Sequence, residues 1–260
     1  MTRIATWNVN GIRARLPQLT DWLQDTRPEF VALQETKVQN TDFPLAAIRD
    51  AGYDCLISGQ PRYNGTATLW RSDQTPHALI GNTLPGMHDD ACRLLISESP
   101  TLWLVNVYVP NGQAVDSAAY GYKLDWLTRL REALATLPLG DQNTPLVVLG
   151  DFNVAPADID VHDPAAWAGK ILCSTGERTA LAGLFDLGLC DLFRTLNPQA
   201  PGFSWWDYRS RGFARDRGLR IDLLLGNAAA RERARACEVD RGPRGLEKPS
   251  DHAPVVLTLD

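Results

Sequence analysis

The chain has 260 residues, of which 44% are hydrophobic, and its formal net charge is −5. This hydrophobic content, which includes eight Trp, is enough for a large core. No apolar stretch approaches the length needed to cross a bilayer, and residues 1–3 lead directly into a strand-like run without the hydrophobic segment of a signal peptide. We therefore expect a soluble, unexported, cytoplasmic protein with no membrane partner.

The sequence predicts one domain spanning residues 1–260. No stretch rich in Pro, Gly or Ser and no low-complexity segment divides the chain. Units of this length with mixed α and β structure are common as single domains, and a compact domain makes a monomer the default expectation.

The five cysteines are Cys55, Cys92, Cys173, Cys190 and Cys237. Their number is odd, their spacing is wide and no C-x-x-C pair occurs, which disfavours both a disulfide framework and a zinc site. We expect free thiols in a reducing compartment.

The charges are distributed unevenly. Residues 209–248 hold eleven Arg and Lys against six Asp and Glu, a local charge of +5, so the remainder carries −10 by subtraction from −5. A basic sector beside an acidic pocket suits a ligand with a phosphate backbone, although a solvated basic face is an equally good interpretation of charge alone.

In chain order, strand-like runs alternate with helical stripes. The stripe of Leu16, Leu19 and Leu23 ends before Pro28, and a second runs from Leu124 to Leu137. Strands are predicted at 53–58, 66–71, 92–98 and 102–109, with short turns such as Asn64-Gly65 that indicate antiparallel neighbours. A helix with Leu181, Leu184 and Phe185 follows the capping box formed by Ser174 and Glu177.

These elements predict an α/β fold, a four-layer sandwich of two mixed β-sheets packed face to face with helices outside. Strands that end in an acid occur in both halves of the chain, which is compatible with a duplicated, pseudo-symmetric fold.

Polar groups lie at or near an end of an apolar strand at six places. The clearest case is the run Leu146–Gly150, which ends in Asp151-Phe152-Asn153. In open α/β sheets the edge at the carboxyl ends of strands is where ligands bind. The other groups are Asn8 and Asn10 after residues 4–7, Glu35 after 30–33, Tyr108 and Asn111 after 103–107, Asp222 within 221–225, and Asp251-His252 before 255–259.

Together these groups indicate a site for a hard cation. Oxygen ligands dominate, cysteine is absent from the set and one histidine joins it. Mg²⁺ is the expected occupant, with Mn²⁺ as a substitute, because Mg²⁺ takes one or two carboxylates and leaves other positions to water and phosphate.

His252 has the strongest functional claim among the four histidines. A carboxylate that hydrogen-bonds an imidazole fixes its tautomer and raises its basicity, so His252 with Asp222 could accept a proton or donate to a phosphoryl oxygen. We expect His162 to be a turn residue, and His77 and His88 to be surface loop residues.

Each candidate also has a purely structural interpretation. Asp151 could cap the following turn, Asn10-Gly11 could form a β-turn, and Glu35 could be an exposed acid at a strand end. Turn chemistry alone does not account for similar groups at the ends of several independent strands.

Five motifs and one longer stretch resemble the exonuclease III family of abasic-site endonucleases, within the endonuclease/exonuclease/phosphatase superfamily, in its bacterial form. The likeness runs from residue 3 to residue 259. The stretch Phe203–Ser210 looks specific to the DNA-repair branch. The five motifs are Trp7–Gly11, Leu33–Lys37, Gly150–Asn153, Gly218–Asp222 and Ser250–Pro254.

The resemblance implies Mg²⁺-dependent hydrolysis of double-stranded DNA on the 5′ side of an abasic site, leaving a 3′-hydroxyl. It also implies 3′→5′ exonuclease and 3′-phosphatase or phosphodiesterase activity on 3′-blocked ends. The implied catalytic residues are Tyr108, Asp151, Asn153, Asp222 and His252, and the implied metal-site residues are Glu35, Asn8, Asp151, Asn153 and Asp251.

The resemblance further implies substrate-binding residues. Trp205, Leu219 and Ile221 would wall an apolar pocket for a flipped-out deoxyribose, while Trp206 is expected to be core. Asn10, Asn111, Arg209 and Arg211 would contact DNA. Leu219 stands where animal relatives carry Trp, and Asn10 where they carry Asp. The stretch 111–123 has no obvious Arg to wedge into the DNA helix, so another loop would have to supply one, and the loop with Arg209, Arg211, Arg215 and Arg217 is a candidate.

Two other functions fit parts of the sequence. A phosphodiesterase for lipid or sugar phosphates would require an apolar membrane loop or a sugar-phosphate site in place of the basic sector. An inactive nucleic-acid-binding module would require that catalytic positions be lost, and the positions that match the family's motifs are all chemically competent.

Overall fold

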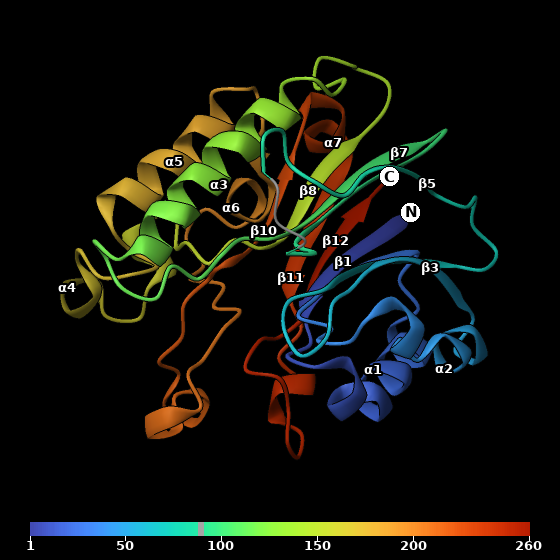
Figure 1. Cartoon of the computed structure of the whole chain (residues 1–260), viewed down its shortest axis with the longest axis horizontal. Helices are drawn as coiled ribbons and strands as arrows, with labels where there is room; N and C mark the ends of the chain where they lie inside the picture. The colour runs from blue at the N-terminus through green and yellow to red at the C-terminus, as the bar shows by residue number, and fades with distance from the viewer. Residues whose placement is uncertain (88–90) are drawn as a thin grey trace.

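Two six-stranded β-sheets pack face to face, and helices cover both outer faces. The computed structural model describes residues 1–87 and 91–260, so His88 lies outside the described residues. In Figure 1, α3 and α5 lie on one side of the sheets and α1 and α2 on the other. This architecture confirms the predicted sandwich of two mixed sheets.

The strands are β1 (Thr2–Asn8), β2 (Phe30–Gln34), β3 (Tyr53–Ser58), β4 (Thr66–Arg71), β5 (Ala78–Gly81), β6 (Leu94–Ser99), β7 (Leu102–Tyr108), β8 (Leu146–Asp151), β9 (Cys190–Asp191), β10 (Asp222–Gly226), β11 (Ala234–Val239) and β12 (Val255–Leu259). The α-helices are α1 (Ile12–Thr26), α2 (Leu45–Asp50), α3 (Ala118–Leu134), α4 (Pro164–Trp167), α5 (Thr175–Phe185), α6 (Leu192–Leu196) and α7 (Ala228–Arg233). Among the described residues there are also five short 3₁₀ turns, η1 (Asn40–Asp42), η2 (Asp158–Asp160), η3 (Arg209–Arg211), η4 (Phe213–Arg215) and η5 (Pro243–Gly245).

Both sheets have a parallel pair at the centre. The first sheet has the order β11-β12-β1-β2-β4-β3 and the second β5-β6-β7-β8-β10-β9. β1 is parallel to β2, β7 is parallel to β8, and the remaining neighbours are antiparallel. The sheets therefore share one pattern of pairing, as a pseudo-symmetric fold requires.

The helices form where the apolar stripes predicted them. Leu19 and Leu23 of α1 are buried, as are Leu127 and Leu134 of α3. α5 begins with the predicted capping box, in which Ser174 and Glu177 each accept a hydrogen bond from the other's backbone N–H. The sequence did not predict the short helices α2, α4, α6 and α7.

The predicted antiparallel strands are confirmed with small shifts of their ends. β3 and β4 coincide with the predicted ranges, whereas β6 and β7 span 94–99 and 102–108. The connection from β3 to β4 is longer than a tight hairpin turn, since residues 59–65 separate them. Asn64 and Gly65, with φ of 52° and 92°, form only its last part.

Alternation along each strand divides the core into three layers. On β8, Val147 and Leu149 pack between the sheets, while Leu146 and Val148 pack beneath α3 and α5. The layer beneath α1 and α2 contains Trp7 and Leu33. The central strands of each sheet therefore have one apolar face that packs beneath the helices and one face that packs against the opposite sheet.

Gly150 allows β8 to approach β7 just before Asp151. Its φ is +147°, and a Cβ at this position would lie 1.9 Å from the carbonyl oxygen of Val107. An L-residue would meet both a strained backbone and a steric overlap here. The strand end that carries Asp151 thus depends on a glycine.

Substituting Gly150→Ala should lower the free energy of unfolding by roughly 3 kcal/mol or more, because strain and overlap add. Gly188→Ala is the matched control: its φ is +89° and no atom lies within 4 Å of its Cβ position, so it should cost about 1–2 kcal/mol. Urea denaturation measures both. Equal losses in the two variants would contradict the close approach.

Candidate active site at one end of the inter-sheet layer

The layer between the sheets changes from apolar to polar toward one end. Along β1 the inward-facing residues are Ile4, Thr6 and Asn8, and along β8 they are Val147, Leu149 and Asp151. β2 and β7 end in the same way, at Gln34 and Tyr108, and β10 begins at Asp222. The parallel pairs end at this edge and their antiparallel neighbours begin there, so the predicted side chains meet.

Asn8 joins the acids of the two sheets. Its amide nitrogen lies 2.9 Å from Oε1 of Glu35 and 2.9 Å from Oδ2 of Asp151, and donates to both. Its oxygen accepts from the backbone N–H of Asn10 at 3.0 Å. Glu35 and Asp151 are 116 positions apart in the chain by subtraction of their numbers, yet one carboxamide bonds both.

Glu35 is held in its ionised form. Its Oε2 pairs with Nζ of Lys37 at 2.7 Å, and the Tyr108 hydroxyl donates to its Oε1 at 2.9 Å. Burial alone would raise the pKa of Glu35, but the charge of Lys37 and the hydrogen bonds from Asn8 and Lys37 outweigh it and lower the pKa. Burial raises the pKa of Tyr108, and the charge of Glu35 adds to that rise.

His252 lies between two buried carboxylates. Its Nδ1 is 2.9 Å from Oδ2 of Asp222, and its Nε2 is 3.8 Å from Oδ2 of Asp151. Burial opposes the charged imidazolium, but Asp222 and Asp151 outweigh burial and raise the pKa of His252 to about 10. Ser204 completes the group by donating its hydroxyl to Asp222 at 2.6 Å.

The pKa of Asp151 is raised, in contrast to that of Glu35. Asp151 is fully buried, and burial raises the pKa of its carboxyl; Asp222 and Glu35 add to the rise, while His252 and the hydrogen bond from Asn8 oppose it. A carboxylate with a raised pKa is a better proton acceptor than an ordinary one.

Asn153 and Asn111 extend the site beyond Asp151. Asn153, with φ of 51°, donates from Nδ2 to Asp151 at 3.1 Å and accepts at Oδ1 from Asn111 at 3.0 Å. The left-handed backbone, which Asn adopts more readily than most residues, turns the side chain back toward the strand end.

Asp251 is held on the side of the site nearest Trp205. Its carboxylate accepts from Asn10 Nδ2 at 2.9 Å and from the Trp205 indole N–H at 3.0 Å. Asn10 in turn accepts a hydrogen bond from Lys37. Asn10, Asp251 and Trp205 therefore form a chain of contacts that reaches back through Lys37 to Glu35.

The predicted pocket walls are mostly covered. Leu219 and Ile221 are fully buried in a small apolar cluster with Val161 and Leu172, and the partly exposed Trp205 packs against it. Trp206 is buried, as expected of a core residue.

The basic sector is only partly a surface. Arg209 and Arg211 of η3 are exposed, and in Figure 1 their segment (orange) projects away from the sandwich. Arg220 is buried instead, 2.7 Å from both Asp160 and Asp191. Arg244 is buried too, its guanidinium 5.0 Å from the Phe213 ring. The sector's net charge therefore overstates the charge that faces solvent.

One histidine prediction was wrong and one is confirmed. His77 is not a surface residue: it is 4% exposed, because the loop before β5 folds inward and packs the ring 5.0 Å from that of Phe30. His162 lies in a bend, where its Nδ1 is 3.2 Å from the carbonyl oxygen of Gly218.

The donor set fits a hard divalent cation. The carboxylates of Glu35, Asp151 and Asp222 lie at one strand edge, and Lys37 balances part of the negative charge. Among the described residues, Asp151, Asp222 and His252 have ligand atoms within 4.8 Å of one another, and a protonated imidazole would offset one of the two negative charges in that group. Glu35, which shares the amide nitrogen of Asn8 with Asp151, is a further carboxylate that could hold a cation.

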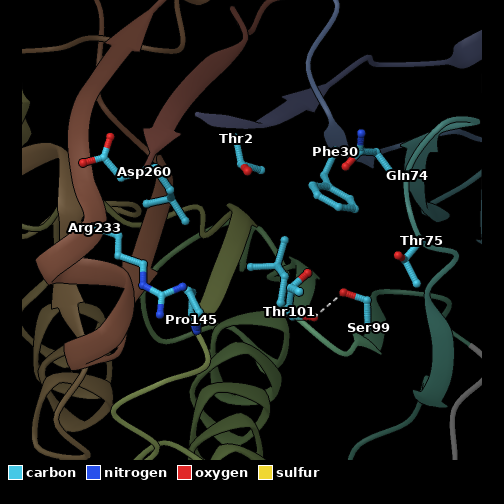
Figure 2. A pocket seen from close by; sticks show the side chains of 11 residues that line it. Thr2, Phe30, Gln74, Thr75, Ser99, Thr101, Pro145, Arg233 and Asp260 are labelled. Carbon is cyan, nitrogen blue, oxygen red and sulfur yellow. Dashed lines mark hydrogen bonds between the residues drawn. The ribbon is translucent and has the colours of Figure 1, made fainter.

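A separate hollow of about 130 Å³ lies at the opposite end of the sandwich (Figure 2). It is lined by the first residues of β1, β2 and β7, namely Thr2, Phe30 and Leu102, together with Arg233 and Asp260. The same strands carry the site at their other ends. The hollow therefore shares no residue with the candidate site.

Comparison with known proteins gives the family. The profile of the Endonuclease/Exonuclease/phosphatase family matches residues 5–252. The chain belongs to this family.

Its similar proteins lie in the exonuclease III branch, which confirms the resemblance. Exodeoxyribonuclease III of Haemophilus influenzae is 33% identical over 97% of this chain and 98% of its own. The structure of a Neisseria 3′ phosphatase bound to a product DNA hairpin is 39% identical with a TM-score of 0.93, and that of an AP endonuclease from Archaeoglobus fulgidus is 36% identical with a TM-score of 0.94; both comparisons cover 100% of each chain. The protein is thus a DNA-hydrolysing enzyme.

Some site residues were missed from the sequence. Lys37 stands in the motif Leu33–Lys37, so its position could have suggested a partner for Glu35. Ser204 stands in the stretch Phe203–Ser210 in the same way. Lys123 carried no such signal, because its partners are two backbone carbonyls and Glu177, 54 positions away.

The His252 imidazole should stay protonated in metal-free protein as the pH rises past 8, because two carboxylates flank it. A folded pKa above the unfolded value of about 6.5 means that its contribution to stability is fully present below that value and is lost as the pH rises toward 10. NMR of labelled histidines measures this. Burial lowers the pKa of His77 to about 4, so His77 provides an internal control. A His252 midpoint near 6.5 would contradict the assignment.

Proposed function

We propose that the protein is a Mg²⁺-dependent DNA-repair phosphodiesterase. It hydrolyses duplex DNA on the 5′ side of abasic sites to leave a 3′-hydroxyl, and it removes nucleotides and phosphate groups from 3′ ends. The observation that carries the proposal is the convergence of Glu35, Asp151 and the Asp222–His252 pair at one strand edge. We further propose that residues 1–260 act as a single catalytic domain and as a monomer.

The bound cation would be held by Glu35, with Asp151 and Asp251 nearby, and would supply charge that polarises the phosphoryl oxygen. Mn²⁺ should substitute, since its preferred ligands are also oxygens. Asn8 donates from its amide nitrogen to the carboxylates of Glu35 and Asp151, so its role is to position these two groups.

The chain's own residues divide the remaining chemistry. Asp151, whose pKa is raised by burial, accepts the proton of the attacking water. Asn153, whose Nδ2 lies 3.1 Å from Oδ2 of Asp151, orients that water. His252 stays protonated through Asp222 and donates to the phosphoryl oxygen as its charge develops. Tyr108 and Asn111 contact the phosphate from the second sheet.

Processing of 3′ ends is a second candidate for the main activity. Leu219 and Ile221 are 0% and 1% exposed, and the Trp205 indole is bonded to Asp251. The predicted pocket therefore offers little open apolar wall to a flipped-out sugar. This observation favours substrates whose reacting phosphate already lies at the 3′ end of a DNA strand.

Three duplexes distinguish these activities: one with an internal tetrahydrofuran abasic analogue, one nicked with a 3′-phosphate, and one with a recessed undamaged 3′ end. We expect all three to be hydrolysed with Mg²⁺ and none with EDTA. Folded protein that leaves the tetrahydrofuran strand intact while processing 3′ ends would reduce the function to end processing. Folded protein that hydrolyses none would remove the proposal.

Asp151→Asn and His252→Ala should each lower kcat by a factor on the order of 10²–10⁴, because they act on proton transfer and charge in the transition state. Duplex binding without metal should remain within a few-fold. Asp186→Asn, at the exposed C-cap of α5, is the matched control and should leave kcat unchanged. Wild-type turnover in either site variant would show that the site is misplaced.

Arg209→Ser combined with Arg211→Ser should weaken duplex binding and reduce the dependence of log Kd on log salt by about 0.9 for each phosphate that these arginines neutralise. Fluorescence anisotropy in EDTA measures binding without cleavage. Arg49→Ser with Arg129→Ser removes the same charge from α2 and α3 and should leave that slope as it is. An unchanged slope in the first variant would rule out phosphate binding by η3.

A further inference from the structure

Lys123 and Glu177 form an ion pair that is completely buried. Both side chains are 0% exposed, and Lys123 Nζ donates to Oε1 of Glu177. Lys123 lies in α3 and Glu177 in the first turn of α5. Buried charges are costly unless they are paired and fully hydrogen-bonded.

The remaining hydrogen bonds of Lys123 go to the backbone of two site residues. Nζ donates to the carbonyl oxygen of Asn153 at 2.6 Å and to that of Asn111 at 3.1 Å. With Glu177, these bonds use all three ammonium donors. The loop after β7 and the loop after β8 are thus tied to one point beneath the site.

Glu177 is satisfied as completely as its partner. Oε1 also accepts from the backbone N–H of Leu172 at 3.0 Å, and Oε2 accepts from the backbone N–H and hydroxyl of Ser174 at 3.0 and 2.6 Å. The carboxylate is therefore fixed by the start of α5. Through Lys123, that helix end sets the position of the two loops.

The loop after β7 also wraps closely over the Lys123 side chain. Gly112, with φ of +87°, has its Cβ position 3.0 Å from Cδ of Lys123 and 2.9 Å from Cδ1 of Ile171. The loop has little room to shift, and Asn111, the preceding residue, donates to the side chain of Asn153 at 3.0 Å.

We propose that Lys123 and Glu177 are positioning residues for hydrolysis, which hold the carboxamides of Asn111 and Asn153 in register by anchoring the backbone of both. This inference rests on the proposed function, in which those carboxamides face the phosphate and the attacking water. Neither charged group touches the substrate. Their effect is on the geometry of a pair of side chains, for which a displacement of about 1 Å can cost about 10²-fold in rate.

The test uses the double variant Lys123→Met with Glu177→Gln. Lys123→Met alone leaves a buried carboxylate unpaired and is expected to unfold the protein, whereas the double variant removes both charges together. It should still fold, with a lower Tm than the unaltered protein, because the carbonyls of Asn111 and Asn153 and one backbone N–H at Glu177 lose their partners. On a duplex that the unaltered protein hydrolyses, kcat should fall about 10- to 100-fold with KM within about threefold.

Two comparisons separate positioning from a structural effect. Asn227→Leu removes another buried side chain that bonds backbone groups, at the other end of β8, where Asn227 accepts from the N–H of Leu146 at 3.0 Å. It should lower Tm and leave kcat unchanged. In an Asn153→Ala background, the loss of kcat from the double variant should be smaller than in the unaltered protein, because one of the two carboxamides that it positions is absent.

Hydrogen exchange gives a readout that does not depend on activity. In the double variant, amide exchange should accelerate in segments 109–117 and 151–156 and stay unchanged in α1. Unchanged exchange in both segments, an unchanged kcat, or an equal loss of kcat with and without Asn153 would each overturn the inference. Failure of the unaltered protein to hydrolyse DNA would count against the proposed function. The exchange result would still decide whether Lys123 and Glu177 anchor the two loops.

Discussion

The hydrogen bonds between Gln34 and Asn106 join the two sheets directly beneath the site. Gln34 Nε2, on β2, donates to Oδ1 of Asn106, on β7, at 2.8 Å, and also to the hydroxyl of Thr6 at 2.9 Å. All three side chains are fully buried. Asn106 donates further to the carbonyl oxygen of Ala67 at 3.0 Å. The site is assembled from residues of both sheets, so its geometry depends on how the sheets are placed relative to each other. This network fixes that placement at the point where the apolar layer between the sheets ends.

Two cationic side chains within the site offset the negative charge of its neighbouring carboxylates. Glu35 comes from the first sheet, and Asp151 and Asp222 from the second. Lys37 pairs with Glu35, and His252 lies between Asp151 and Asp222. Each internal cation stabilises one part of a cluster that would otherwise repel itself. A divalent cation held by Glu35, as proposed, would add to a site that is already arranged, which would limit the reorganisation needed when DNA binds.

The sequence predicted the parts of this arrangement that follow from strand periodicity. Asn8, Asp151 and Asp222 end or begin apolar strands, and the parallel and antiparallel pairing brings such ends to one edge. It did not predict Lys123, whose partners are backbone groups on distant loops, or the burial of Arg220, whose acids lie 60 and 29 positions away. The residues around His77 also give no sign that their loop turns inward. Such contacts depend on how loops pack, which local pattern does not encode.

The most direct test is a crystal structure of the protein with an abasic duplex and Mn²⁺, with the ion located by its anomalous scattering. The account predicts a peak bonded to a Glu35 oxygen at roughly 2.1 Å, the distance typical of small divalent cations on oxygen, with the abasic-site phosphate between that ion and His252. An anomalous peak away from Glu35, or DNA bound elsewhere on the protein, would contradict the claim that both sheets together form one hydrolytic site.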